Sequence, residues 1–368
     1  MIANAMDISL WPADDFCVVG NDIYFFHGTL NCLLQYNMET HSVKYLGVIE
    51  GEKAVQEKLF CRIFFYDNKL FLFPYYASKV VVYDFNTEQY RTICDGENYK
   101  FRDAFADDDF VYAINEKGSE VIKFALKDEA FREKYDLKGT VPISFEGTLC
   151  GKVTCYDEIV LIPIYSYSDN INFFIIFDKK EKKFKWIKTD AEANGFYVAF
   201  MYDEKIYTQC IGNLVFYEID YHTGKIQREI HKFNNTMYVL GECDGRLLIG
   251  VEKGNTPTEY ERNEYIWYTP ETGEFSEFEY KYDQKDRSYF KYPFSFGPYK
   301  KTKDGFIFYD EYHGCIVEKK GMDIVMHKPV LSADDRNKVY ENIRKGGLSE
   351  VYYESDGWDL NLLMYLLD

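Results

Sequence analysis

The stretch from Lys79 to Ile93 reads KVVVYDFNTEQYRTI and decides the fold that this sequence predicts. Val80–Tyr83 form a β-rich run, a polar turn follows at Asp84–Thr87, and Tyr90–Ile93 form a second short run. Asp, Asn and Thr accept the backbone angles of a tight turn, so the two runs are expected to pair as a β-hairpin. Weak copies of this hairpin recur along almost the whole chain, which makes it one unit of a repeat.

Two turn signals alternate along the sequence, and the first is the turn of the hairpin described above. Further copies of this hairpin begin with the apolar runs Leu33–Tyr36, Val121–Phe124, Phe174–Phe177, Leu214–Tyr217, Tyr265–Tyr268 and, in a degenerate form, Cys315–Glu318. The other signal is an Asp or Asn turn between two apolar runs, and its copies start at Asn21, Asp67, Asp108, Asp157, Asp203, Asp244 and Asp304. Those starting positions are 46, 41, 49, 46, 41 and 60 residues apart.

Each repeat unit therefore carries four short strands, named A to D, with one tight turn between A and B and another between C and D. Units of about 40 to 50 residues with four strands are typical of a β-propeller, in which radially packed sheets cover each other. Counting both signals predicts an all-β, seven-bladed propeller. Six blades with an irregular end is the alternative, because the last interval is long.

From about Phe16 to Met326 the chain resembles the β-propeller superfamily in general. The blades have no Trp-Asp ending, and the one Gly-Gly pair lies outside the repeats, so no particular propeller family is indicated. A further hypothesis closes the ring by pairing Asp7–Trp11 as a strand of the last blade.

After Pro329 the pattern changes, so residues 1–330 are assigned to the propeller and residues 331–368 to a C-terminal helical extension packed on it. Ser332–Asp335 resembles a capping box, which predicts a helix over Asp334–Lys345. The leucine-rich segment Trp358–Leu367 is expected to form a final helix, either packed on the propeller or docked on a partner protein.

Charge and cysteine content exclude several classes of function. The net charge is -18 with a pI near 4.9, and such a field repels nucleic acid and anionic membranes, although a local basic patch can still bind a small anion. The nine cysteines include no CxxC pair and are expected to be buried free thiols in a reducing compartment. The N-terminus has no signal-peptide pattern and no run is long enough to span a membrane, so a cytoplasmic location is expected.

No compact catalytic or cofactor-binding motif is present. The sequence has no G-x-S-x-G, H-E-x-x-H, P-loop or G-x-G-x-x-G, and its six histidines show no metal-ligand spacing. We therefore predict no cofactor and no metal. The oligomeric state is left open.

The connections between blades and strands differ in length on the two faces of the propeller. The A–B and C–D turns are short, whereas the B–C and D–A connections are long, as in Gly47–Lys58, Tyr165–Asn170, Glu252–Asn263 and Phe278–Pro293. Functional residues concentrate on loops that a rigid scaffold presents. A site is therefore expected on the loop-rich face, around the central channel.

Candidate ligand-binding residues follow from the repeat. Five or six residues before the A–B turn stand Arg62, Arg102 and Lys152, in three consecutive blades. Three converging cations would concentrate an anionic or carboxylate ligand, whereas the alternative is that they pair with neighbours such as Asp103. Aromatic and imidazole groups on the adjoining connections complete the predicted set: Tyr75, Tyr165, Tyr167 and His313.

The leading hypothesis is a non-enzymatic binding or scaffold propeller that presents its loop-rich face to a protein, a peptide or a small polar or anionic ligand. The alternative, which rests on fold analogy, is a hydrolase or lyase that acts on a carbohydrate or a small acid in the channel. That alternative requires two close carboxylates, or a carboxylate and a histidine, with Asp103 and Glu116 as candidates. A third hypothesis is an assembly subunit that docks through Trp358–Leu367.

Overall fold

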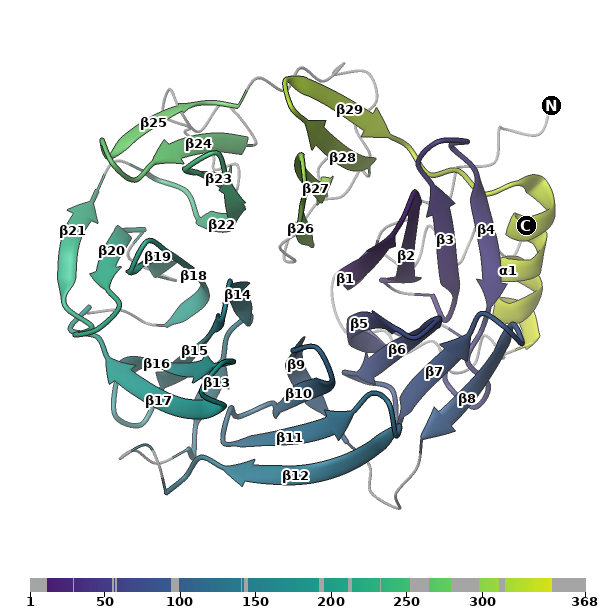
Figure 1. Cartoon of the computed structure of the whole chain (residues 1–368), viewed down its shortest axis with the longest axis horizontal. Helices are drawn as coiled ribbons and strands as arrows, with labels where there is room; N and C mark the ends of the chain where they lie inside the picture. Colours follow the sequence, from purple (N-terminus) through teal and green to yellow (C-terminus); the bar gives the residue numbers. More distant parts are fainter. Residues whose placement is uncertain are drawn as a thin grey trace.

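The computed structural model describes residues 12–345 apart from residues 29, 55, 57, 94–98, 140, 142–144, 192–194, 211–213, 232, 252–264, 279–297 and 311–314. Seven antiparallel sheets stand around a central channel like the blades of a propeller (Figure 1). Each blade uses consecutive strands of the chain, four in every blade except blade 4, which has five because its strand A is split; strand A lies at the channel and strand D at the rim. The predicted seven-bladed, all-β propeller is confirmed, and the six-bladed alternative is wrong.

The strands of the first four blades follow in chain order. Blade 1 contains β1 (Pro12–Val19), β2 (Asp22–His27), β3 (Leu33–Asn37) and β4 (Val43–Gly47). Blade 2 contains β5 (Phe60–Tyr66), β6 (Lys69–Pro74), β7 (Val80–Asp84) and β8 (Gln89–Ile93). Blade 3 contains β9 (Phe101–Ala106), β10 (Phe110–Asn115), β11 (Glu120–Ala125) and β12 (Ala130–Asp136). Blade 4, whose strand A is broken in two, contains β13 (Thr148–Cys150), β14 (Thr154–Tyr156), β15 (Ile159–Ser166), β16 (Ile171–Asp178) and β17 (Lys183–Lys188).

The remaining three blades follow the same plan. Blade 5 contains β18 (Phe196–Tyr202), β19 (Lys205–Cys210), β20 (Phe216–Asp220) and β21 (Ile226–Ile230). Blade 6 contains β22 (Met237–Cys243), β23 (Arg246–Val251), β24 (Tyr265–Thr269) and β25 (Glu274–Glu277). Blade 7 contains β26 (Tyr299–Thr302), β27 (Gly305–Asp310), β28 (Cys315–Lys320) and β29 (Asp323–His327).

The two turn signals of the sequence have a clear structural cause. In the A–B turn of blade 2, Asp67 and Asn68 both have positive φ angles, 45° and 58°. Asp and Asn tolerate this left-handed conformation, which matches the twist of the two strands that they join. The hairpin Lys79–Ile93 is β7 and β8, the outer half of blade 2. The side chains of β7 from Val80 to Tyr83 are buried because neighbouring blades cover both of its faces.

Blade 7 meets blade 1 at a seam that closes the ring (Figure 1). Both blades are built from their own consecutive strands, so among the described residues no strand is shared across the seam. The buried ring of His327 joins the two blades, because its Nδ1 lies 3.1 Å from the Tyr36 hydroxyl and its Nε2 lies 3.1 Å from Glu318 Oε2. Beyond blade 7, Leu331 forms a parallel bridge with Val43 of β4.

One α-helix is described, α1 (Ala333–Lys345), and it begins one residue before the predicted start. It lies along the outer edge of blade 1 (Figure 1), where the Asn342 side-chain amide donates a hydrogen bond of 2.8 Å to the Tyr45 hydroxyl. The segments Asp7–Trp11 and Trp358–Leu367, on which the ring-closure and final-helix hypotheses depend, lie outside the described residues.

Candidate ligand site in the channel

One position of strand A recurs at the channel in every blade. It stands five residues before the first residue of the A–B turn, and the turns begin at Gly20, Asp67, Asp108, Asp157, Asp203, Asp244 and Lys303. The residues at this position, which we call the belt, are Asp15, Arg62, Asp103, Lys152, Val198, Val239 and Pro298 in blades 1 to 7. The belt has a charged half of alternating sign in blades 1 to 4 and an apolar half in blades 5 to 7.

A break in the inner strand of blade 4 exposes the backbone next to the belt. Cys150 of β13 and Thr154 of β14 pair with β15 on either side of Gly151–Val153, and these three residues face only two residues of β15. One of those two is Pro163, which has no N–H to donate to a neighbouring strand. The extra residue makes a bulge, and bulges redirect side chains and release backbone groups from the ladder.

Arg62 uses that released backbone and joins four blades. Its guanidinium donates to Asp103 through Nε at 2.5 Å and through Nη2 at 3.1 Å, and Nη2 also donates to the Val153 carbonyl at 2.9 Å. Its Nη1 lies 3.6 Å from Asp15 Oδ1. Asp103 in turn accepts the Val153 N–H at 2.7 Å. Blades 1, 2, 3 and 4 are therefore held together at one guanidinium.

The electrostatics of this network keep Arg62 charged. Burial acts to lower the pKa of Arg62, but the carboxylates of Asp103 and Asp15 outweigh it and raise the pKa. The side chains of Arg62, Asp103 and Asp15 are largely buried, with 13%, 6% and 2% of their surface exposed. Arg62 thus pairs with acceptors of the protein itself. Pairing with neighbours such as Asp103 was the predicted alternative to ligand binding.

The sequence predicts that Arg62, Arg102 and Lys152 converge, but only Arg62 and Lys152 of these three line the channel cavity. In the register of the blades Asp103, not Arg102, occupies the position of Arg62. Arg102 stands one residue earlier, where its Nη1 donates to the Tyr75 hydroxyl at 2.7 Å and its Nε donates to the Cys150 carbonyl at 3.0 Å. Lys152 lies in the blade 4 bulge and lines the channel cavity together with Arg62.

The other predicted ligand residues lie apart from this cavity. Tyr165 is buried, and its hydroxyl donates to Asn170 at 2.9 Å. Tyr167 packs edge-on against Tyr165 with ring centroids 4.6 Å apart, and 59% of its surface is exposed. His313 lies outside the described residues.

The channel holds a cavity of about 430 Å³, which is lined by every belt residue except Asp103. In strands β1, β5, β9, β18 and β22, every described residue that lines the cavity stands at the belt or between the belt and the A–B turn. Ala106, Tyr156 and Lys301, which also line it, lie close to the A–B turns. The cavity therefore occupies the half of the channel toward the short turns. The long B–C and D–A connections predicted a site in the opposite, loop-rich half. Many residues of those connections lie outside the described ranges.

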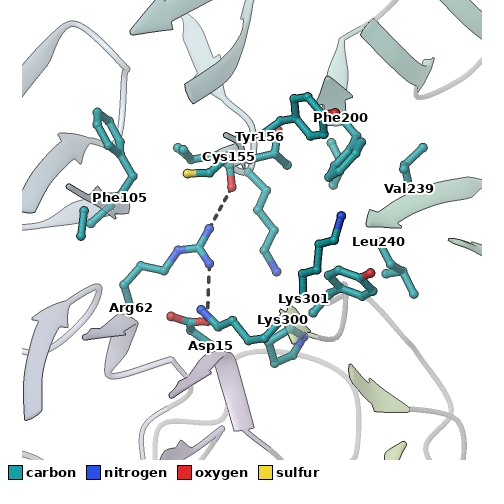
Figure 2. Close-up of a pocket in the computed structure, with 18 of the residues that line it drawn as sticks. Asp15, Arg62, Phe105, Cys155, Tyr156, Phe200, Val239, Leu240, Lys300 and Lys301 are labelled. Atoms are coloured by element: carbon teal, nitrogen blue, oxygen red, sulfur yellow. Dashed lines mark hydrogen bonds and ion pairs between the residues drawn. The ribbon is translucent and has the colours of Figure 1, made fainter. Parts of the chain in front are cut away.

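The cavity has two unlike sides (Figure 2). On one side Arg62 and Lys300 converge on Asp15, and Lys300 Nζ lies 2.6 Å from Asp15 Oδ1. On the other side Phe200, Val239 and Leu240 form an apolar wall. The boundary between a charged and an apolar side follows the division of the belt.

Lys301 adds a further cation, next to the apolar wall (Figure 2). It forms an ion pair with Glu242 of blade 6, and this hydrogen bond raises the pKa of Lys301. Consecutive residues of a strand point to opposite faces, so Lys300 reaches blade 1 while Lys301 reaches blade 6. Asp15 was missed from the sequence because the repeat position was followed through only three blades. The two lysines were missed because they stand two and three residues after that position, which is Pro298 in blade 7.

Thiol and phenol groups in the cavity stay protonated near neutral pH. Desolvation by the surrounding protein raises the pKa of the Tyr156 hydroxyl and of the Cys155 thiol, although the Cys155 side chain is exposed where it lines the cavity. Asp103 is engaged by Arg62, and Glu116 is exposed after β10 and does not line the cavity, so the carboxylate pair of the enzyme hypothesis is not assembled there. In the described ranges no group of three or more potential ligands is placed to hold a metal ion, and no helix has the length and apolarity to cross a membrane.

No protein-family model and no curated protein matches the chain. Among solved structures, the computationally designed Ika8 protein matches with a TM-score of 0.53 and 10% identity over 88% of this chain and 96% of its own. Virginiamycin B lyase from Staphylococcus aureus matches with a TM-score of 0.55 and 10% identity over 84% and 95%. A designed protein and an enzyme thus share this fold, which does not select a function. These likenesses show the β-propeller fold alone, so the function is argued from the residues of this chain.

Proposed function

We propose that the protein is a binding propeller whose channel cavity holds a small organic anion with an apolar body. The observation that carries this proposal is the two-sided cavity, with cations on one wall and Phe200, Val239 and Leu240 on the other. A ligand with a carboxylate or phosphate at one end and a hydrocarbon or ring at the other matches both walls. A fully polar ligand would leave the apolar wall without a partner.

The size of the cavity supports a small molecule over a protein or a long peptide. Its volume is about 430 Å³, and small-molecule sites in proteins typically occupy roughly 300 to 1,000 Å³. Such sites combine apolar walls with a few placed polar groups, as this one does.

The balance of charge on the polar wall supports an anion. Arg62, Lys152 and Lys300 provide three positive charges, whereas Asp15 and Asp103 provide two negative ones. Lys301 and Glu242 cancel each other, and Asp157, which also lines the cavity, is exposed in its A–B turn, where solvent screens its charge. One positive charge is therefore in excess inside a protein whose net charge is -18. Lys152 and Lys300 line the cavity, and an ammonium group can donate to several acceptors, so these are the groups that we expect to meet the ligand.

The test compares three probes by thermal denaturation: phenylacetate, its neutral amide phenylacetamide, and acetate. Phenylacetate can use both walls, phenylacetamide lacks the charge, and acetate lacks the apolar body. We expect phenylacetate to raise Tm more than either of the other two, because a ligand that binds only the native state stabilises it.

A matched pair of variants then locates the site. Lys300→Gln removes the charge beside Asp15, and we expect it to weaken phenylacetate binding by about tenfold, the loss of one charge-assisted hydrogen bond. Lys303→Gln makes the same change in the exposed A–B turn and is expected to leave binding unchanged. Equal binding of phenylacetate and phenylacetamide, or equal losses in the two variants, would contradict the proposal.

A cytoplasmic location is part of the same proposal. The seven described cysteines are all free, and five of them are buried, which suits a reducing compartment. Fractionation of cells that produce the protein would check this, and recovery outside the cytoplasm would contradict it.

A further inference from the structure

The segment Asp178–Lys188 reads DKKEKKFKWIK and reverses the charge of its surroundings. It contains six lysines, and we call them the lysine edge: Lys179, Lys180, Lys182, Lys183, Lys185 and Lys188. With Asp178 and Glu181 the segment carries a net charge of +4, so the rest of the chain carries -22. A basic segment in so acidic a protein is a local feature that the overall composition hides.

The fold places this segment at the rim of the ring. It comprises the C–D turn of blade 4 and the outermost strand β17, which borders only β16 (Figure 1). Five of the six lysines are exposed, and Lys179 is half-buried. Phe184 and Trp186 alternate with them and pack into the core between blades 3 and 4. The lysines are therefore displayed beside an open strand edge.

Few of these lysines have an acidic partner within the protein. Lys182 pairs with Asp107 of blade 3, and Lys183 lies 3.8 Å from Glu181. The ammonium of Lys185 stands 4.2 Å above the Tyr221 ring. Within the part of the chain that the structure describes, no carboxylate forms an ion pair with Lys180, Lys185 or Lys188.

Other outer strands show that a strand edge can be protected without such a cluster. Charged residues on an edge strand hinder unwanted pairing. On β12 the charges alternate in sign, and Lys134 pairs with Glu120 at 3.0 Å. On β21 Arg228 pairs with Glu218 at 2.9 Å. Charges of one sign repel each other, so mixed charges protect an edge with less repulsion than the lysine edge has.

We propose that the lysine edge is a docking surface for an acidic, extended segment of a partner protein. Such a segment would add a strand along the free edge of β17 and place its carboxylates against the lysines, with backbone hydrogen bonds giving affinity and charge giving selectivity. The six residues of β17 span roughly 20 Å, which is the length of one short strand.

The charge distribution favours a short acidic peptide over a nucleic acid. A long polyanion extends beyond roughly 20 Å and would meet the surrounding surface, where the remaining chain carries the net charge of -22. An acidic segment of strand length needs only the lysine edge. This docking surface is separate from the channel cavity, so its test does not depend on the proposed ligand.

The experiment measures fluorescence anisotropy of a labelled oligoglutamate peptide of roughly ten residues, the upper length of an ordinary strand, with the full chain at low salt. The test variant is Lys180→Glu/Lys183→Glu/Lys185→Glu. The matched control is Lys44→Glu/Lys303→Glu/Lys320→Glu, which changes the net charge equally at exposed lysines in blades 1 and 7. Circular dichroism confirms that both variants are folded.

We expect the wild type to bind the peptide and to release it as salt is added. Reversal of three lysines is expected to weaken binding by about tenfold or more, whereas the control keeps nearly the affinity of the wild type. Replacement of the same three lysines by arginine is expected to preserve binding. Equal losses in the test and control variants, or no binding at low salt, would overturn the proposal. Tighter binding of a single-stranded oligonucleotide than of the peptide would overturn the choice of an acidic protein segment.

Discussion

The charged half and the apolar half of the belt occupy the same position in their blades but stabilise the ring by different forces. In blades 1 to 4 a single guanidinium holds Asp15, Asp103 and the Val153 carbonyl. In blades 5 and 6 Val198 and Val239 are buried against neighbouring side chains. Hydrogen-bonded charges demand one geometry, whereas apolar contacts tolerate several. The charged half therefore fixes the channel, and the apolar half gives the cavity a wall that a ligand can cover.

The largest expected effect comes from breaking the charged half. Arg62→Leu leaves Asp15 and Asp103 largely buried with fewer partners, and removal of one member of a buried pair costs about 3 to 5 kcal/mol. We expect this loss in the free energy of unfolding, measured by urea denaturation with tryptophan fluorescence.

A double variant separates lost pairing from lost packing. Removing Asp103 as well should restore part of the stability, so Arg62→Leu/Asp103→Leu is expected to lose less than the two single variants together. Strict additivity would show that Arg62 and Asp103 stabilise the ring independently, and it would contradict their assignment to one network.

A smaller effect is expected in the apolar half. Val239→Ala removes two buried methyl groups, each worth about 0.8 kcal/mol or somewhat more when a small void remains. We expect a loss of roughly 1 to 2 kcal/mol in the same denaturation measurement. A loss as large as that of Arg62→Leu would remove the distinction between the two halves.

Lys300→Gln tests whether a charge beside the belt serves stability or binding. About one third of the Lys300 side chain is exposed, so solvent screens its pair with Asp15, and Arg62 still faces that carboxylate. The expected loss of stability is below about 1 kcal/mol. A much greater loss in urea denaturation would assign Lys300 to the framework of the ring instead of the ligand.

The smallest effect is expected at the seam, where blade 7 of the apolar half meets blade 1 of the charged half. Burial lowers the pKa of His327, although its hydrogen bond with Glu318 acts to raise it. An unfolded histidine titrates near pH 6.5, at about its ordinary value. Between that pH and the lower pKa of folded His327, the unfolded chain binds the proton more readily than the folded protein does. The free energy of unfolding therefore decreases as the pH falls through this range.

His327→Gln should remove this contribution to the pH dependence of unfolding. The comparison uses thermal denaturation of both proteins from neutral to mildly acidic pH. His41 also faces His327, with ring centroids 5.5 Å apart, so His41→Gln serves as the control for the neighbouring imidazole. An unchanged pH dependence in His327→Gln would exclude His327 as its source.

The fold could be predicted from the sequence because propeller blades are local. Every strand pairs with its neighbour in the same blade, and turns such as Asp67–Asn68 mark where the pairs are joined. The number of blades and the assignment of Lys79–Ile93 to an outer hairpin follow from counting those turns. The seam could not be predicted in this way, since His327 and Tyr36 are 291 residues apart.

The site was only partly predictable, because it depends on contacts between blades. Counting positions identified Arg62 and Lys152, but a slip of one residue chose Arg102 in place of Asp103, and one residue reverses the side of a strand. The partners of Arg62 depend on the bulge at Gly151–Val153. Pro163 inside an apolar run was the signal that could have indicated that bulge.

The most direct test of the two-sided cavity is a crystal structure of the protein with bromophenylacetate, in which anomalous scattering locates the bromine. We expect the carboxylate beside Lys152 and Lys300 and the brominated ring against Phe200 and Val239. A ligand bound in the reverse orientation, or only outside the channel, would contradict the proposed site.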